Sequence, residues 1–206
     1  MIETVERGGF IWPAADQWCS KVIFEEVADL AEVMPLIQGR SVALQAGGNC
    51  GVWAAWLAAH FETVWTFEPD PDNFACLVKN VPVNVRYRHA GLGDRAGHVG
   101  LEADPKNCGA HYVAGPGGIP MITIDSLNLP ALDFLQLDIE GFEPLALQGA
   151  EATLRRCRPV VMIEEKGLSA AYYSIKRGTA EKWLSGFGYR VVKKIRKDLV
   201  LTCASA

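Results

Sequence analysis

The chain has 206 residues, with 20 Lys or Arg against 24 Asp or Glu, so its formal net charge is -4. Half of the residues are hydrophobic and 21% are charged, which is ordinary for a globular protein and excludes the disordered and collagen-like classes. The mild acidity disfavours nucleic acid as a partner, because neutralising phosphates needs a basic surface. The length fits one domain, which we place over residues 1–206.

The N-terminus has neither a basic start followed by an apolar stretch nor a small-residue cleavage site, so it does not read as a secretory signal. The longest strongly apolar run, residues 52–61, is far shorter than the roughly 20 residues of a membrane span. None of the cysteines forms a CxxC pair. We therefore expect a cytoplasmic protein with reduced thiols and no membrane partner.

Residues 1–40 form a predicted helical extension, in which apolar residues recur with a period near 3.6 over residues 21–37. This helix is expected to cover a sheet edge or the mouth of a site. Strands and helices then alternate through the core, residues 41–206, which predicts a parallel sheet with helices on both faces. The expected strands are residues 41–46, 63–67, 84–89, 132–138 and 159–164, and the expected helices are residues 50–60, 71–80 and 143–156.

Towards the C-terminus, a short helix from Gly178 is expected to stop at Gly186 or Gly188. Residues 189–195 and 199–203 are two β-prone runs joined by three residues, which predicts a hairpin that places an antiparallel strand on a mostly parallel sheet. The long irregular segment, residues 102–120, is expected to be a functional loop, because loops of this length are uncommon inside compact domains.

The first predicted strand runs into a glycine-rich turn that contains Gly47, Gly48 and Gly51. Glycine lets a ligand approach the backbone closely, and in open α/β sheets ligands bind at the carboxyl ends of the strands. Glu68 ends the second strand, where an acidic side chain can accept the hydroxyl hydrogens of a ribose. This pair predicts a nucleoside cofactor and leaves both a nicotinamide dinucleotide and S-adenosylmethionine open.

Three further features favour S-adenosylmethionine. The third strand is followed by a turn with an acidic residue, Asp94, where an adenine amino group could be met. The fourth strand ends in LQLDIEGFE, which places Asp138, Glu140 and Glu143 at the same sheet edge as Gly47 and Glu68. The predicted C-terminal hairpin, where a dehydrogenase would be expected to have a separate substrate domain, is the third feature.

With these features the sequence resembles the FkbM-type family of S-adenosylmethionine-dependent methyltransferases. The resemblance covers roughly residues 11–159 or beyond, and it rests on the order and spacing of QAGGNCG, FEPDPDNFACLVKN, AGLGD, ITIDSL, FLQLDIEGFEPLALQGAEATLRRCRP and VVMIEE. It implies an α/β, Rossmann-like class I methyltransferase fold, with a seven-stranded, mostly parallel sheet and a C-terminal antiparallel hairpin strand.

The resemblance also implies roles for individual residues. The glycine turn would pass beneath the methionine and ribose of the cofactor, and Asp138 would face the sulfonium and the acceptor. Gln45 departs from the family pattern, which usually has an acidic residue there to engage the amino acid end of the cofactor. The cofactor-binding residues carried over in this way are Gln45, Gly47, Asn49, Gly51, Glu68, Asp94 and Asp138.

Methyl transfer is an in-line displacement, and a carboxylate near the acceptor can act as a base or as a ligand of a divalent cation. The first catalytic candidates are Asp138 and Glu140, followed by Glu164 or Glu165. If the segment is extended, Asp138 and Glu140 point to opposite sides and only one faces the substrate. Glu140 could equally be a charge that complements a helix N-terminus. His89 and His111 are weaker base candidates.

The resemblance points to O-methylation, with a hydroxyl group of a small molecule or sugar as the acceptor. Three other hypotheses stay open. A short-chain dehydrogenase is suggested only by the spacing of Tyr172 and Lys176. An RNA ribose methyltransferase could use Asp138 and Lys166, and a non-catalytic cofactor-binding module would account for Gln45. Trp12 and Trp18 either cap the pocket or, by ordinary aromatic burial, pack the N-terminal extension.

Overall fold

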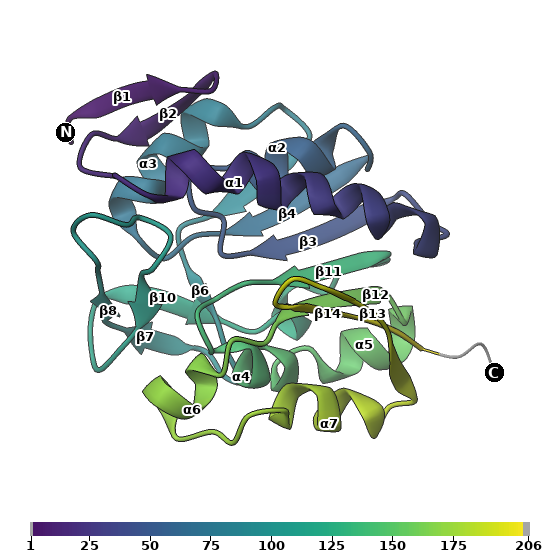
Figure 1. The fold of residues 1–206 in the computed structure, drawn as a ribbon. Coiled ribbons are helices and arrows are strands. Elements are labelled where there is room, and N and C mark those ends of the chain that lie inside the picture. The colour runs from purple at the N-terminus through teal and green to yellow at the C-terminus, as the bar shows by residue number, and fades with distance from the viewer. Residues whose placement is uncertain (1, 204–206) are drawn as a thin grey trace.

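The computed structural model describes residues 2–203, so residue 1 and residues 204–206 of the predicted domain lie outside the described part. A seven-stranded sheet forms the centre of the molecule, in the order β13-β14-β12-β11-β3-β4-β5 (Figure 1). The strands from β12 to β5 in this order run parallel to one another, which confirms the predicted sheet. Their bounds are β3 Val42–Ala46, β4 Thr63–Phe67, β5 Val85–Arg88, β11 Phe134–Leu137 and β12 Val160–Glu164.

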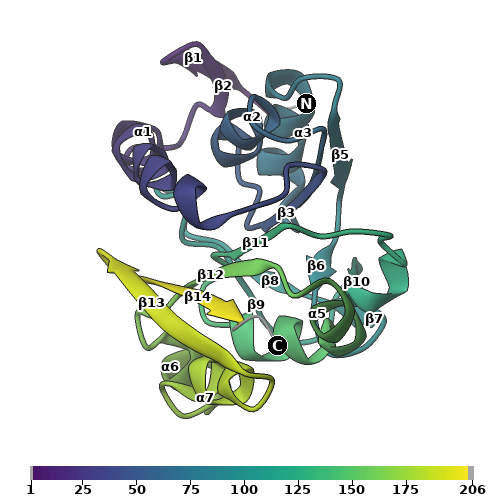
Figure 2. The same ribbon diagram turned by 90° about the vertical axis from the view of Figure 1, so that its right-hand side faces the viewer.

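The sheet is covered on both faces because its strands are apolar at successive positions. Ala43 and Phe134 belong to one buried cluster, whereas their neighbours Leu44 and Leu135 belong to another, as the alternation of side chains along a strand requires. The first cluster packs under α1 Cys19–Ala28, α2 Val52–Ala58 and α3 Pro71–Asn80, and the second packs under α4 Glu143–Gln148, α5 Glu151–Cys157 and α7 Thr179–Ser185 (Figure 2).

The C-terminal hairpin is present as predicted. β13 Tyr189–Ile195 pairs with β14 Asp198–Cys203, and β14 lies antiparallel against β12 at this edge of the sheet. The predicted helix after Gly178 is α7, which ends at Ser185 just before Gly186. The sheet is therefore mixed, with one antiparallel pairing between β14 and the parallel strands.

Two long helices of the prediction are broken in the structure. The helix expected over residues 21–37 ends at Ala28 and continues as two 3-10 helices, η1 Asp29–Glu32 and η2 Met34–Leu36, the second of which contains Pro35. The helix expected over residues 143–156 divides at Gly149 into α4 and α5. Proline lacks the amide hydrogen of a continuing α-helix, and a side chain on Gly149 would collide with the carbonyl oxygen of Gly93.

Several elements were not predicted from the sequence. The N-terminal extension is not purely helical, because it begins with a hairpin of β1 Thr4–Arg7 and β2 Phe10–Pro13. The loop over residues 102–120 contributes to two small sheets, and a helix precedes α7. These elements are β6 Gly91–Leu92, β7 Gly97–Val99, β8 Leu101–Glu102, β9 Tyr112–Val113, β10 Ile119–Ile122, the 3-10 helix η3 Asp125–Leu127 and α6 Leu168–Tyr173.

The order of the strands places a crevice between β3 and β11. The chain proceeds from β3 to β4 and β5 on one side and returns to β11 on the other, which is the switch point where open α/β sheets bind ligands. The turn after β3 touches the turn after β11, since a Cβ on Gly47 would lie 1.8 Å from the carbonyl oxygen of Asp138. Among the described residues, no helix has the length and apolar character needed to cross a membrane.

Candidate active site

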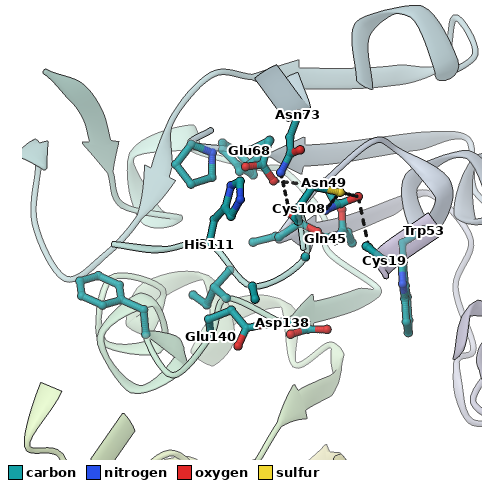
Figure 3. Close-up of a pocket in the computed structure, with 18 of the residues that line it drawn as sticks. Cys19, Gln45, Asn49, Trp53, Glu68, Asn73, Cys108, His111, Asp138 and Glu140 are labelled. Carbon is teal, nitrogen blue, oxygen red and sulfur yellow. Dashed lines mark hydrogen bonds between the residues drawn. The ribbon is translucent and has the colours of Figure 1, made fainter. Parts of the chain in front are cut away.

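A cavity of about 340 Å³ opens at the carboxyl ends of β3, β4 and β11. Its walls come from the sheet edge, from α1 and from the loop between β8 and β9. Figure 3 shows Glu68 and His111 towards one end of this cavity and Asp138 with Glu140 towards the other. One continuous space therefore connects the predicted ribose position with the predicted catalytic carboxylates.

The glycine turn has the backbone conformation that its sequence requires. Gly47 and Gly51 have φ of 83° and 91°, and Asn49 between them has a φ of 46°. Gly47 and Asn49 line the cavity, whereas Gly51 lies behind them as the N-cap of α2. Asn49 also anchors the opposite wall, because its Nδ2 donates a hydrogen bond of 2.8 Å to the carbonyl oxygen of Cys108.

Glu68 is buried at the end of β4 and lines the cavity. Its two carboxylate oxygens accept hydrogen bonds from the backbone amides of Asn49, at 2.6 Å, and Asp70, at 2.8 Å. Burial raises the pKa of Glu68 to about 7, and these two hydrogen bonds oppose the rise. Each oxygen keeps a second lone pair, so the side chain can still accept a ligand hydroxyl while it holds the glycine turn.

Two glutamines lie side by side in register on the central strands, Gln45 on β3 and Gln136 on β11. Gln45 also lines the cavity; its Nε2 donates to the carbonyl oxygen of Gly47 at 2.8 Å, and its Oε1 accepts from Oγ1 of Thr66 at 2.6 Å. Gln136 is 1% exposed and also lines the cavity, and its Oε1 has no hydrogen-bond partner.

Asp94 is the predicted cofactor residue that lies apart from the others. It is half-buried, does not line the cavity and forms an ion pair of 3.8 Å with the exposed Arg95. The residues just before it, Ala90 to Leu92, line the cavity instead. In the segment after β5, small and apolar residues therefore contact the cavity, and the carboxylate of Asp94 does not.

Asp138, Glu140 and Glu164 form a carboxylate cluster in which one oxygen of each lies within 4.8 Å of the others. Lys166 lies inside this cluster and forms ion pairs with Glu164 and, at 3.4 Å, with Glu140. Burial and the charge of Asp138 raise the pKa of Glu140 to about 7, although Lys166 opposes this. The same causes raise the pKa of Glu164 above its usual range.

Both Asp138 and Glu140 line the cavity, which corrects the expectation that an extended segment would turn them to opposite sides. β11 ends at Leu137, and the chain then turns with φ of 55° at Glu140 and 96° at Gly141. Glu140 does not cap α4. Glu143 binds the turn instead, through Oε1, which accepts hydrogen bonds from the amides of Ile139 at 2.9 Å and Gly141 at 3.2 Å.

The loop over residues 102–120 forms one wall of the cavity, with residues 107–111 against the glycine turn and α3. His111 is held there by Asp70, whose Oδ2 lies 3.1 Å from Nδ1 of the imidazole. Burial alone would lower the pKa of His111, but Asp70 and the carbonyl oxygen of Asp104 raise it to about 9. His111 is thus a charged anchor of the loop, whereas His89 contacts the carbonyl oxygen of Pro69 at 3.0 Å.

Helix α1 forms the other wall. Trp12 is fully buried and packs the extension, but Trp18 is 60% exposed at the cavity rim, together with Val22. One helical turn further on, Glu26 faces the cavity near the carboxylate cluster. Trp12 therefore has the packing role that the sequence left open, and Trp18 lies where it can cover the pocket.

Glu26, Gln136 and Lys197 are cavity residues that the sequence did not single out. Gln136 stands two residues before Asp138 on the same strand, which is a signal that alternation along β11 could have revealed. Lys166 follows VVMIEE directly and was considered only for the RNA hypothesis. Glu26 and Lys197 come from α1 and the C-terminal hairpin, and their approach to the site depends on tertiary packing.

The seven-stranded sheet with its antiparallel edge strand, together with the glycine turn after β3 and the buried acidic residue after β4 at the switch point, gives the chain a Rossmann-like class I methyltransferase fold. The model of the Methyltransferase FkbM domain matches residues 45–191, so the chain belongs to the FkbM methyltransferase domain family. This match covers β4, β5, β11 and β12 in full, the end of β3 and the start of β13, together with the carboxylate cluster, whereas β14 lies beyond it.

Comparison with individual proteins gives one relative in sequence and two structures that share the fold. The chain is 28% identical over 131 residues to the hexuronic acid methyltransferase AglP of Haloferax volcanii, covering 59% of this chain and 54% of AglP. It thus spans about half the length of the curated relative that it matches. The fold is shared with Methyltransferase FkbM from Methylobacillus flagellatus KT, at 22% identity and a TM-score of 0.58, over 85% of this chain and 47% of that one. It is also shared with precorrin 8W decarboxylase from Methanobacterium thermoautotrophicum, at 14% identity and a TM-score of 0.51, over 87% and 90%.

Proposed function

We propose that this protein transfers a methyl group from S-adenosylmethionine to a hydroxyl group of a small molecule or sugar. The observation that carries the proposal is the single cavity that joins Gly47 and Glu68 to Asp138 and Glu140. A cofactor held at the first pair would extend towards the second pair. Family membership supports the same reaction class.

The residues at the cofactor end fit a nucleoside with a charged tail. Glu68 offers carboxylate lone pairs for ribose hydroxyls, and the small residues Ala90 and Gly91 leave room for a flat base beside it. Gly47 lines this end of the cavity, and a side chain there would collide with the carbonyl oxygen of Asp138, so the turns after β3 and β11 lie directly against each other.

In this proposal Glu140 acts as the general base. Its pKa of about 7 lies near the value that is most effective for proton transfer at neutral pH. Glu140 takes the proton of the acceptor hydroxyl while Asp138 orients the acceptor, and Lys166 holds the Glu140 carboxylate in place at 3.4 Å. The bound S-adenosylmethionine would supply an electrophilic methyl group, and the carbon–sulfur electron pair would leave with its sulfur atom.

A sugar is the acceptor class that the comparisons favour, since AglP is described as a hexuronic acid methyltransferase. The acceptor end offers both acceptors and donors of hydrogen bonds, from Glu26, Glu140, Lys166 and Lys197, as a polyol requires. An RNA acceptor is less suited to this end, because its carboxylates would repel a phosphate backbone.

A divalent cation is left out of the proposed mechanism. Asp138, Glu140 and Glu164 could together hold a metal ion by their spacing. The ammonium group of Lys166, however, already lies between Glu140 and Glu164 and supplies the compensating positive charge. We therefore expect methyl transfer to continue in the presence of EDTA, and a loss of activity that magnesium or manganese restores would contradict this.

The proposal is tested in two steps. S-adenosylhomocysteine should raise the melting temperature of the protein, whereas NADH should not; this separates a methyltransferase from a dehydrogenase. Mass spectrometry of glucuronic acid, methyl glucoside and an RNA oligonucleotide, each incubated with S-adenosylmethionine, then separates the acceptor classes. Binding without methylation of any acceptor would favour the non-catalytic module, and the absence of any thermal shift would refute the cofactor assignment.

A further inference from the structure

Two cysteines from distant parts of the chain meet at the wall of the cavity. Cys19 begins α1, Cys108 belongs to the loop between β8 and β9, and both line the cavity. They are 7% and 6% exposed, whereas the neighbouring Cys50 and Cys76 are fully buried. An oxidant as small as hydrogen peroxide therefore has a route from the cavity to Cys19 and Cys108.

One carboxylate holds the backbones of the two cysteines together. Oδ1 of Asp16 accepts hydrogen bonds from the amide of Cys19 at 3.1 Å and from the amide of Cys108 at 3.3 Å. The two amide nitrogens are thus no further apart than the lengths of these two bonds together, which is within the Cα separation of roughly 4.4–6.8 Å that a disulfide spans. Asp16 is 2% exposed and forms an ion pair of 3.5 Å with Arg7, so this alignment is part of the packed fold.

The two sulfur atoms contact the same side chain, the carboxamide of Asn49. Sγ of Cys19 lies 3.7 Å from Oδ1 of Asn49, and Sγ of Cys108 lies 3.9 Å from the same oxygen (Figure 3). Hydrogen bonds with the thiols of Cys19 and Cys50 lower the pKa of Cys108, although burial opposes this. The hydrogen bond with Cys108 raises the pKa of Cys19. Since the thiolate is the reactive form of cysteine, Cys108 is the nucleophile of the pair and Cys19 is its partner.

We propose that Cys19 and Cys108 form a reversible disulfide when the protein meets hydrogen peroxide, and that this bond controls ligand exchange in the cavity. The thiolate of Cys108 attacks one peroxide oxygen, the O–O bond breaks, and the hydroxide that leaves takes up the proton released by Cys108 to form water. The thiol of Cys19 then attacks the sulfur of the sulfenic acid. The S–O bond breaks, and the hydroxyl group leaves with the Cys19 proton as a second water. Two thiols are oxidised to one disulfide, and one peroxide is reduced to two waters.

The disulfide would join the two walls of the cavity. In the reduced protein, α1 and the loop meet through hydrogen bonds, such as that from the amide of Gln17 to the carbonyl oxygen of Lys106 at 2.8 Å. Contacts of this kind open and close, whereas a covalent bond between Cys19 and Cys108 keeps the walls together. The control of exchange rests on the proposed function, but the formation of the disulfide does not.

The first test maps the disulfide in the full-length protein. The reduced protein is treated with hydrogen peroxide, its remaining thiols are blocked with iodoacetamide, and a non-reducing digest is analysed by mass spectrometry. We expect a pair of peptides joined through Cys19 and Cys108, which dithiothreitol separates. Cys19→Ser should instead leave Cys108 as a sulfenic acid that dimedone traps. Oxidation that leaves both thiols of the wild type free, or that joins Cys108 to Cys50, would overturn the proposal.

The second test measures ligand exchange by tryptophan fluorescence, since Trp18 and Trp53 line the cavity. S-adenosylhomocysteine should dissociate from the oxidised protein more slowly than from the reduced protein, by about tenfold or more, and dithiothreitol should restore the rate. Cys203→Ser is the matched control, because Cys203 ends β14 outside the cavity lining. Peroxide should slow exchange in this variant as in the wild type, and should not slow it in Cys19→Ser.

The outcomes separate the two proposals. A mapped disulfide that leaves the exchange rate unchanged would overturn the control of the cavity. If the reduced wild type binds no S-adenosylhomocysteine, the proposed function fails, whereas the peptide map still decides whether Cys19 and Cys108 form the disulfide.

Discussion

Glu143 shows how one buried carboxyl group can shape the catalytic turn. Burial raises its pKa to about 8, and Oε1 accepts from the amides of Ile139 and Gly141. Below that pH the side chain is protonated, and a glutamine is then its close equivalent. The carboxyl group acts as a positioning residue for Asp138 and Glu140, which border the turn.

We predict that Glu143→Gln keeps near wild-type turnover at neutral pH, because the amide oxygen can still accept from the turn. Glu143→Leu leaves two buried amides unpaired and should lower the free energy of unfolding by about 1–3 kcal/mol and reduce kcat. Urea unfolding and steady-state kinetics measure these effects. Equal kcat for Glu143→Leu and the wild type would contradict the positioning role.

Glu68→Ala tests the cofactor end. The substitution removes the proposed ribose contact and the acceptor for the amides of Asn49 and Asp70. We expect the affinity for S-adenosylhomocysteine to fall by about tenfold or more. Asp94→Ala is the matched control, because Asp94 lies outside the cavity lining. This variant should bind S-adenosylhomocysteine with the affinity of the wild type. A large effect of Asp94→Ala would restore the adenine role that the sequence suggested.

At the residue scale the sequence could locate side chains that follow buried strands. Gly47, Glu68, Asp138 and Glu140 all lie at the ends of β3, β4 and β11, and all line the cavity. Asp94 could not be placed in this way, because it follows β6, which leaves the main sheet to pair with β10. The direction of its side chain depends on that distant pairing and not on a local pattern.

At the scale of elements, apolar strands and proline or glycine signals were sufficient for much of the fold. β4 and α3 have the predicted bounds, and Asp70 caps α3 by accepting from the amides of Asp72 and Asn73. The break between α4 and α5 was not predictable locally. Asp125, far upstream, accepts from the amides of Ala152 and Thr153 and so begins a second helix.

The contact between the turns after β3 and β11 yields a prediction at this scale. Gly47→Ala would place a Cβ 1.8 Å from the carbonyl oxygen of Asp138 and would strain a residue at φ of 83°. We expect a loss of a few kcal/mol in unfolding free energy, together with weaker binding of S-adenosylhomocysteine. Gly97→Ala is the control, because its added Cβ meets nothing within 4 Å. Similar denaturation midpoints for the two variants would refute the close approach.

At the scale of the whole molecule, the cavity is assembled from segments that are far apart in sequence. The amide of Gln17 donates to the carbonyl oxygen of Lys106, and Asn73 donates to that of Cys108, so α1, α3 and the loop are joined around the site. Lys197 reaches it from the C-terminal hairpin. Periodicity and motifs identify each segment, and they suggested a helix at the mouth of a site and a functional loop. They do not give these contacts, so the side chains that the walls bring to the cavity could not be named.

Burial of many carboxyl groups in one fold determines how stability depends on pH. The pKa is raised to about 7 in Glu68, Glu140 and Asp198 and to about 8 in Glu143, in each case chiefly by burial. Because each value lies above that of the unfolded chain, the folded state binds more protons between about pH 4 and pH 8. These carboxyl groups therefore make the free energy of unfolding fall as the pH rises through this range.

His111 acts in the same direction at higher pH, since its pKa of about 9 exceeds the unfolded value of 6.5 and its stabilisation is lost as it deprotonates. We predict a melting temperature that decreases by on the order of 10 °C between about pH 5 and pH 8, measured by calorimetry at constant ionic strength. Glu143→Gln should show a shallower decrease, because one of the titrating groups is removed. Turnover should rise over the same range as Glu140 loses its proton, so the conditions that activate the proposed base are those in which the fold is less stable. A melting temperature that rises from pH 5 to pH 8 would contradict the burial of these carboxyl groups.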